Sequence, residues 1–583
     1  MWKLNLLFWA FILALQAQNA LRSLKGVPVP EPAGLSTYVR DRQALVVLGK
    51  AFFWDMQAGS DGLTACATCH FHAGADHRAQ NTLVDPNNAF PINADLKTLE
   101  FPFRLLSNPA NRTSPVIRDS SVRVGSAGTF RRIFDSIIPG EPGELGRDEL
   151  DKPEFMQGSL QARRVTVRNS PSVYNSVFYV NSFWDGRAAR MFNGFTVTGL
   201  ASEAPGLLIG NEDDTALTRH TVRMDRASLA SQAVGPILDH LEMSYAGRTW
   251  PQLARKLFSL APLAAQRVAT DDSVLGPFAS ATVGLKPEHT YQSLLQAAFE
   301  PKFWNSGIRV TAAGEVRDDG EFSQAEYNFS LFWALSLQAY QSTLNSDDSP
   351  FDRFMDGNST ALNAQQQEGM RLFNTTGNCT QCHNGAEFSA AVFNNNGGGR
   401  GNSFERTGVR PIAEDIGSGN GVFKSIGLRN VEFTGPYFHN GGQATLEQVV
   451  DFYRRGGDFT PVANEIRPFN INESQKAALV AFLKALSDDR VRYERAPFDH
   501  PELCVPVGHV EQSAGVLAAG NDLRFPASAA ETWRLIPVSG ALGNPAPLRT
   551  FEEMLNGIGK VESERAHALA DGCGAPWPGS QPQ

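Results

Sequence analysis

The sequence has no excess of positive charge and no long apolar run beyond its first residues. Lysine and arginine number 52 against 61 aspartates and glutamates, which gives a formal net charge of −9. Such a balance offers no basis for binding nucleic acid. A membrane-spanning helix takes about 20 apolar residues, and no stretch after residue 20 meets that requirement. We therefore expect a mature chain with no membrane span and no nucleic-acid partner.

Only the N-terminus is strongly apolar. One lysine precedes an apolar stretch from Leu4 to Leu15, and small residues follow at Ala17 and Ala20. This stretch is too short for a membrane span but suits the core of a secretory signal peptide. No cysteine lies nearby, so a lipid anchor is not indicated. We predict a cleaved signal peptide over residues 1–20 and a periplasmic protein.

Cysteine is scarce, and its spacing is informative for that reason. The six cysteines comprise one pair in ACATCHFH (65–72), one pair in CTQCH (379–383), and two near the C-terminus, Cys504 and Cys573. In an oxidising compartment the last two could form a disulfide. The sequence does not show whether they come within bonding distance.

Each CxxCH segment meets the requirements of a c-type haem. Two thiols about one turn apart add to the haem vinyl groups, and the following imidazole ligates the iron. The residues concerned are Cys66, Cys69 and His70 in the first segment and Cys379, Cys382 and His383 in the second. A zinc site would need a second cysteine pair close by, and a thioredoxin-like dithiol would not need the histidine twice. The sequence therefore predicts two covalently attached haems.

Helical patterns surround both segments, and strand-like alternation is scarce. ALVVLGKAFFWDMQ precedes the first motif, and residues 361–373 lead into the second. Thr445 with Gln448, and Asn472 with Gln475, form capping boxes, each at the start of an apolar stripe with helical spacing. We expect a mainly α-helical fold with long loops around two haems.

Five stretches of the sequence resemble the bacterial di-haem cytochrome c peroxidases and their relative MauG. They occur in the family's order: LGKAFFWD with CATCH, RNSPSVYNSVFYVNSFWDGRA, GPILDHLEMS, FDRFMDGNSTALNAQQQEGMRLFN before CTQCH, and FKSIGLRNVEFTGPYFHNGGQATLEQVV. The resemblance covers most of residues 40–490 and implies two cytochrome c-like domains, 30–345 and 346–492. The region 190–300 is longer than in compact peroxidases, which enlarges the N-terminal domain. Residues 493–583 form a C-terminal extension with no recognised counterpart.

The resemblance assigns two side chains to the chemistry. Trp184, in FWDGR, matches the tryptophan that lies between the family's two haems, where an easily oxidised indole can carry an electron hole. Glu242, before Met243, matches the family's peroxide acid/base, which moves a proton between the two peroxide oxygens. Without the family motifs, Trp184 would be interpreted as a core residue and Glu242 as a solvated one.

The family also holds a calcium ion between its domains, largely through backbone and amide oxygens. Calcium prefers such hard oxygen ligands. The matching positions here are Asn169, Thr434 and Pro436. The resemblance thus implies one calcium ion, which these three residues would not indicate on their own.

The distal ligands distinguish branches of the family. Counting from FTGPYFHNGG into the next helix places Tyr453 where the peroxidases have methionine and MauG has tyrosine. A thioether favours ferrous iron, whereas an anionic phenolate favours oxidised iron. Tyr453 is therefore a predicted ligand of the second haem, although its apolar helix face would also suit a core tyrosine.

The first haem has no obvious distal ligand. At the spacing where the family's peroxidases place a distal histidine, this chain has none. The resemblance therefore predicts an open first haem, as in MauG. His72 and His77 remain alternatives, but we interpret both as surface or loop histidines.

Together these features predict a periplasmic enzyme that uses hydrogen peroxide. It would reduce peroxide to water with electrons from a small cytochrome c or cupredoxin, or oxidise a partner protein as MauG does. Two other classes stay open, namely an O2-dependent di-haem oxygenase and a non-catalytic electron-transfer cytochrome. FWDGR and the Glu-Met pair argue against the second of these, because a pure carrier does not need them.

Overall fold

The structure is a computed structural model of the 583-residue chain. It describes residues 20–79, 83–84, 101–149, 156–157, 160–393, 404–459, 466–509 and 531–557. The predicted signal peptide, apart from Ala20, and Cys573 lie outside the described residues.

Helices form the larger part of the regular structure. The α-helices are α2 (Arg42–Trp54), α3 (Ser228–Ala233), α4 (Trp250–Phe258), α5 (Tyr291–Ala298), α6 (Gln324–Tyr327), α7 (Phe329–Gln341), α8 (Pro350–Met355), α9 (Ala364–Asn374), α10 (Leu446–Arg454), α11 (Glu473–Lys484), α12 (Asp489–Arg492) and α13 (Phe551–Leu555). The helices predicted before both haem motifs, and those predicted after the capping boxes at Thr445 and Asn472, are confirmed as α2, α9, α10 and α11.

The expected mainly α-helical fold is found only in part, because short strands accompany the helices. Within the part of the chain that the structure describes, strands pair into antiparallel two-stranded sheets. The pairs are β1 (Leu83–Val84) with β4 (Arg123–Val124), β2 (Arg104–Leu106) with β3 (Val116–Asp119), β5 (Arg132–Ser136) with β6 (Leu145–Asp148), β7 (Met156–Gln157) with β8 (Leu160–Gln161), β9 (Leu207–Gly210) with β10 (Leu217–His220), β11 (Phe404–Glu405) with β12 (Phe423–Lys424), and β13 (Leu503–His509) with β14 (Glu531–Ile536). Most are too short to show a period of two in the sequence.

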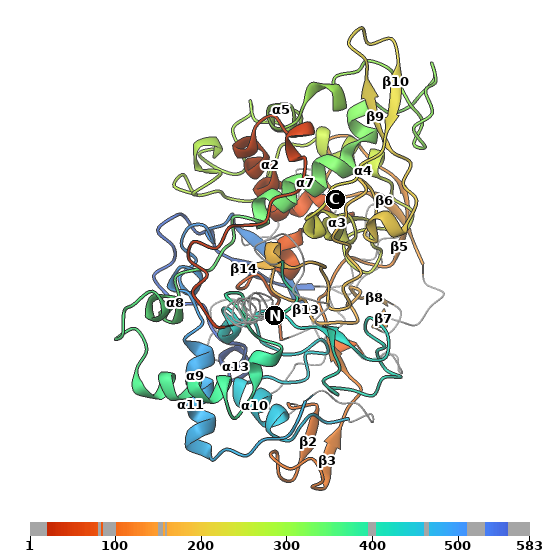
Figure 1. Ribbon diagram of the computed structural model, residues 1–583. Helices are drawn as coiled ribbons and strands as arrows, with labels where there is room; N and C mark the ends of the chain where they lie inside the picture. Colours follow the sequence, from red (N-terminus) through yellow and green to blue (C-terminus); the bar gives the residue numbers. More distant parts are fainter. Residues whose placement is uncertain are drawn as a thin grey trace, which may run out of the picture.

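The first core is built around α2 and α7. These helices approach so closely that a Cβ added to Gly49 would lie 1.9 Å from the carbonyl oxygen of Ser336. Phe52 of α2 stacks on Tyr291 of α5 at 5.0 Å between ring centroids and packs against Trp333 of α7 at 4.9 Å. Figure 1 shows α2, α5 and α7 together in one half of the molecule.

The second core joins α9 and α11. Backbone contact is again close, because a Cβ at Gly369 would lie 2.0 Å from the carbonyl oxygen of Ala478. Phe482 of α11 packs against Phe373 of α9 at 5.4 Å. Figure 1 places α9, α10 and α11 together, away from α2 and α7. The exact domain boundaries, and the assignment of 190–300 as an insertion, stay predictions.

The C-terminal extension is part of the folded body. Cys504, Val505 and Trp533, from β13 and β14, are buried in the core around α2. Phe551 of α13 packs edge-on against Phe101 at 5.7 Å. Cys504 is disulfide-bonded. Among the described helices, none has both the length and the apolar character that a bilayer span needs.

Candidate functional site

The first CxxCH motif lies on one tight turn. Residues Cys66–Cys69 form a 3-10 helix, which follows α2 and a short 3-10 turn at Met56–Ala58. Thr68 Oγ1 accepts a hydrogen bond from the Ala65 backbone N–H at 2.9 Å, which closes the start of the turn. Both thiols thus come from consecutive parts of one short helical turn, as attachment to a single haem requires.

The ring of His70 is oriented by the loop that follows it. Its Nδ1 lies 2.9 Å from the carbonyl oxygen of Gly74, which can only accept, so Nδ1 carries the hydrogen and Nε2 is left to bind a metal. Gly74 has φ +75°, and a Cβ there would lie 2.8 Å from Ser172 Oγ. Glycine is therefore required where the backbone turns its carbonyl toward His70.

The second motif repeats this arrangement. Residues Cys379–Gln381 form a 3-10 helix, and the His383 backbone N–H donates to the carbonyl of Cys379 at 2.8 Å. His383 Nδ1 lies 3.1 Å from the carbonyl oxygen of Phe388, which favours a hydrogen on Nδ1. Burial lowers the pKa of both His70 and His383, as suits neutral imidazole ligands. The two motifs therefore fit two covalently attached haems.

Glu242, the predicted acid/base, lies within electrostatic range of the first motif. Its carboxylate raises the pKa of both Cys66 and Cys69, in each case after the larger effect of burial. Burial, reinforced by Asp239 and opposed by Arg187, raises the pKa of Glu242 itself to about 7. Glu242 nevertheless keeps some accessible surface, as expected for a side chain on the wall of an enclosed space. An acid with a pKa near neutrality can both take and return a proton.

Tyr453 is the residue predicted to ligate the second haem. It lies on the last turn of α10 and is partly accessible. Burial raises the pKa of its hydroxyl, and the thiols of Cys382 and Cys379 raise it further. The two thiols of the second motif therefore lie within electrostatic range of Tyr453, and its role as a ligand of the second haem stays a prediction.

Trp184 connects segments from both halves of the molecule. Its indole Nε1–H donates to the carbonyl of Asn169 at 2.8 Å, and its own carbonyl accepts from the Lys424 backbone N–H at 2.8 Å. The ring is 8% exposed and meets the His439 imidazole edge-on at 6.2 Å. Trp184 therefore contacts segments of both halves, and its role as a relay stays a prediction.

The three predicted calcium positions lie in adjoining loops. The Asn169 amide donates to the carbonyl of Pro436, and the Asn169 backbone N–H donates to the carbonyl of His439 at 2.8 Å. Thr434 lies two residues before Pro436 in the same loop. Rotation of the Asn169 amide by half a turn would direct its oxygen toward this loop. The donor set fits calcium, which remains a proposal.

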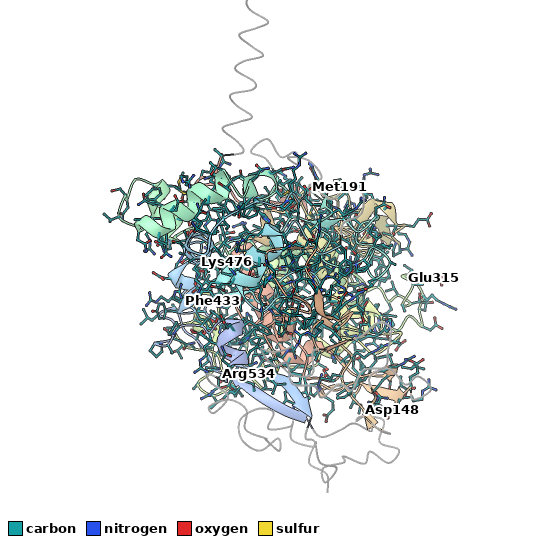
Figure 2. All side chains as sticks on the ribbon, turned by 90° about the horizontal axis from the view of Figure 1, so that it is seen from below. Asp148, Met191, Glu315, Phe433, Lys476 and Arg534 are labelled. Atoms are coloured by element: carbon teal, nitrogen blue, oxygen red, sulfur yellow. The ribbon has the colours of Figure 1, made fainter. Side chains whose placement is uncertain are left out.

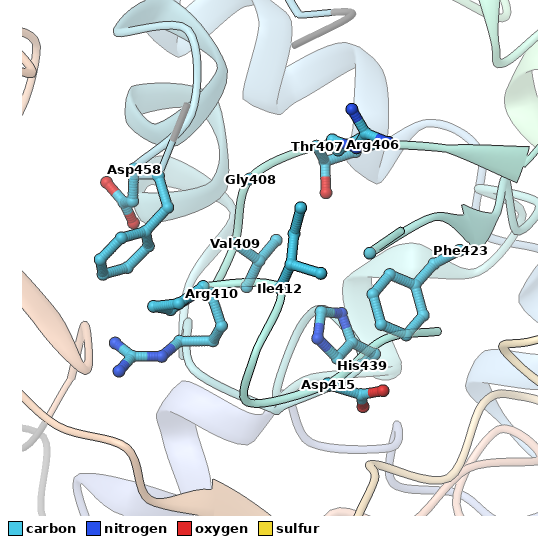
Figure 3. Close-up of a pocket in the computed structure, with 13 residues that line it drawn as sticks. Arg406, Thr407, Gly408, Val409, Arg410, Ile412, Asp415, Phe423, His439 and Asp458 are labelled. Atoms are coloured by element: carbon cyan, nitrogen blue, oxygen red, sulfur yellow. The ribbon is translucent and has the colours of Figure 1, made fainter. Parts of the chain in front are cut away.

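A cavity of about 370 Å³ adjoins the Trp184 contact. Figure 3 shows the rings of Phe423 and His439 on its wall, with Arg410 and Asp415 nearby. Phe423 stacks on His439 at 3.7 Å and 12°. Burial lowers the pKa of His439 to about 3, so the ring is neutral. Sequence analysis had not singled out His439, although it lies within the quoted PYFH segment.

The interpretation of His72 and His77 as surface histidines was wrong. Each is only 4% exposed, and their rings stack on each other at 3.5 Å. His72 Nε2 donates to the carbonyl of Arg549 at 2.7 Å, and Arg534 donates to His77 Nε2 at 3.3 Å. Both histidines therefore bind the C-terminal extension, where Figure 2 labels Arg534 on β14.

The comparisons place this site in a known family. A model of the di-haem cytochrome c peroxidase family matches residues 43–360, more than half of the chain. The chain therefore belongs to that family. The match includes the first motif, Trp184 and Glu242, and ends before the second motif.

Several curated proteins align with part of the chain. Cytochrome-c peroxidase IdrP2 of Denitromonas iodatirespirans is 36% identical over 26% of this chain and 47% of its own length. Methylamine utilization protein MauG of Methylorubrum extorquens is 34% identical over 26% and 42%. Cytochrome-c peroxidase IdrP1 of a Pseudomonas species is 33% identical over 35% and 69%. The chain thus spans about half the length of the first curated relatives it matches.

Among solved structures, the chain also shows similarity to the diheme peroxidase BthA of Burkholderia thailandensis. It has 17% sequence identity and a TM-score of 0.41, over 78% of this chain and 88% of that one.

Proposed function

We propose that this protein is a di-haem peroxidase that reduces hydrogen peroxide at its first haem motif. The observation that carries the proposal is Glu242, a carboxyl whose pKa burial raises to about 7 and whose charge acts on the thiols of Cys66 and Cys69. Reduction consumes two electrons and two protons per peroxide and yields two waters. We propose that a small cytochrome c or cupredoxin supplies the electrons at the second motif.

Each residue has a defined task in this proposal. Bound haem iron supplies the redox chemistry that breaks the O–O bond. The Glu242 carboxylate would take a proton from one peroxide oxygen and deliver it to the other, which leaves as water, and the two electrons and two protons convert the remaining oxygen to the second water. Gly74 keeps the His70 ring in one tautomer. Trp184, in contact with segments of both halves, relays electrons between the sites.

A second function is favoured by Tyr453. Because a phenolate ligand stabilises oxidised iron, a tyrosine next to Cys379 and Cys382 suits a site that stores oxidising equivalents. The MauG alternative, in which a partner protein is oxidised, therefore stays a candidate. It predicts that peroxide is reduced without any small donor when the partner protein is present.

We further propose a calcium ion at Asn169, Thr434 and Pro436 and a periplasmic location. The contact between the Asn169 amide and the Pro436 carbonyl supports the ion. The N-terminal leader pattern and the disulfide at Cys504 support an oxidising compartment. Metal analysis of the purified protein should find one calcium per chain, and Asn169→Ala should lose it. A wild-type protein without calcium would refute the ion.

Removal of the attachment cysteines tests the proposed function. We expect Cys66→Ser/Cys69→Ser to lower the haem content from two to one per chain and to reduce peroxide consumption, with a reduced small cytochrome c as donor, to background. Cys379→Ser/Cys382→Ser is the matched control. It should also lose one haem and donor-supported turnover, yet its remaining haem spectrum should still change on adding peroxide. Full turnover in either double variant would contradict the division of roles.

A further inference from the structure

Trp54 is a buried, oxidisable side chain close to the first predicted iron ligand. It ends α2 and is 3% exposed. Phe53 lies between, with its ring centroid 6.5 Å from that of His70 and 5.9 Å from that of Trp54. Trp54 is thus two ring contacts from His70, on a route that does not include Trp184.

An oxidised Trp54 would have no good acceptor for its proton. The indole Nε1–H donates to the Tyr340 hydroxyl at 2.9 Å. A neutral phenol is a weak base, and burial raises the pKa of Tyr340 well above its ordinary value. Loss of one electron from Trp54 would therefore leave a cation that keeps its proton.

The C-terminal extension places a positively charged histidine, His500, against the Trp54 ring. The His500 imidazole stacks on the Trp54 indole at 4.5 Å between centroids, with the planes 10° apart. His500 Nδ1 lies 2.9 Å from the carbonyl oxygen of Pro501, and Nε2 lies 3.1 Å from Glu494 Oε1. Both partners are acceptors, so both ring nitrogens carry hydrogen and the ring is an imidazolium.

The electrostatics of the pair agree with this protonation state. Burial lowers the pKa of His500, but the Glu494 carboxylate outweighs it, and the pKa stands above its ordinary value. Glu494 also accepts from the Asn544 amide at 2.5 Å, which fixes the carboxylate. Because Nε2–H points along the imidazole plane, Glu494 lies at the edge of the ring, while the charged face meets Trp54.

An imidazolium on an indole face stabilises the neutral indole and destabilises the oxidised indole. It attracts the neutral indole through the cation–π interaction. It repels an indole cation, and in a buried site such repulsion is weakly screened. The stack therefore makes the oxidation of Trp54 less favourable.

We propose that His500, held charged by Glu494, protects Trp54 from oxidation and so keeps electron transfer on the Trp184 route. The inference rests on the proposed function, because hydrogen peroxide is the oxidant. Reduction of one hydrogen peroxide requires two electrons. The oxidation that His500 opposes would supply one of these electrons from the Trp54 indole. His500 and Glu494 lie outside residues 43–360, so the protection is supplied by a segment beyond the family match.

The test compares tryptophan oxidation in the holoenzyme and its variants. Hydrogen peroxide is added in several-fold excess without a donor, and digestion with mass spectrometry measures hydroxylated Trp54. We expect His500→Phe, which keeps a stacked ring without charge, to raise Trp54 oxidation at least tenfold and to show a tryptophan radical by EPR. Adding Trp54→Phe should remove that radical.

Two further variants control the result. Glu494→Gln keeps the shape of the pair but removes the anion that holds the proton on His500, so it should also raise the oxidation of Trp54. This variant provides the test if His500→Phe folds poorly. His289→Phe changes a histidine whose ring contact is with Phe278, at 4.9 Å, and should leave Trp54 oxidation at the wild-type level.

Equal Trp54 oxidation in wild type, His500→Phe and Glu494→Gln would overturn the inference. A wild-type haem spectrum that does not respond to peroxide would instead refute the proposed function. In that case photogenerated ruthenium(III) tris-bipyridine serves as the oxidant. It should again oxidise Trp54 faster in the two variants, and equal rates would overturn the protective role of His500.

Discussion

Glu242→Gln should slow the reaction of the protein with hydrogen peroxide by roughly 10²–10⁴-fold, the usual contribution of a positioned acid/base. Glutamine has the shape of glutamate but cannot accept the peroxide proton. Both haems should stay attached, because the thiols and His70 are unchanged. Stopped-flow spectroscopy of the Soret band measures the rate.

The pH dependence of the same reaction gives a second readout. The pKa of Glu242 is raised to about 7, so the carboxyl is protonated below that pH and becomes a proton acceptor above it. The wild-type rate should rise as the pH increases through about 7 and then level off, whereas Glu242→Gln should lack this step. Asp239→Asn, which removes a charge that raises the Glu242 pKa, should move the step to lower pH. An unchanged rate and profile in Glu242→Gln would exclude the proposed role.

Tyr453→Met should change the second site most strongly. Exchange of a phenolate for a thioether stabilises the ferrous form, and axial ligands adjust haem potentials over about 0.8 V. We expect the potential of the second haem to rise by hundreds of millivolts, on the order set by that range. The fully ferric variant should no longer react with peroxide until one electron has been added.

Tyr437→Phe is the matched control for this change. Tyr437 lies in the same half, and its hydroxyl donates to the carbonyl of Val431 at 3.0 Å. Its removal should leave the spectrum and potential of the second haem unchanged. If Tyr453→Met leaves both unchanged as well, Tyr453 is a core residue and not a ligand.

The parts of the site that depend on local sequence were predictable. Haem attachment needs two thiols and an imidazole on one turn, so the spacing of Cys66, Cys69 and His70 contains the whole requirement. The capped helices α10 and α11 were equally local, since the side chain of Thr445 accepts from the backbone N–H of Gln448, as the capping box implies. Family motifs, not periodicity, placed Trp184 and Glu242.

The parts that depend on distant partners were not predictable. His72 lies 477 residues from its hydrogen-bond partner Arg549, and no local pattern connects them. The stack of Trp54 on His500 likewise joins α2 to the C-terminal extension. The short hairpins were not predicted for another reason. Strands of two to five residues are held by register and contacts and show no readable alternation in the sequence.

The most direct test of two haem sites acting together uses the fully ferric protein. One equivalent of hydrogen peroxide is added, and the ferric EPR signals, the Soret band and the near-infrared region are followed together. Coupling of the sites through Trp184, with Tyr453 as ligand, predicts rapid loss of both ferric signals and a new near-infrared band. A ferric protein that stays unchanged until one haem has been reduced would contradict the assignment of Tyr453 and the proposed cooperation of the two sites.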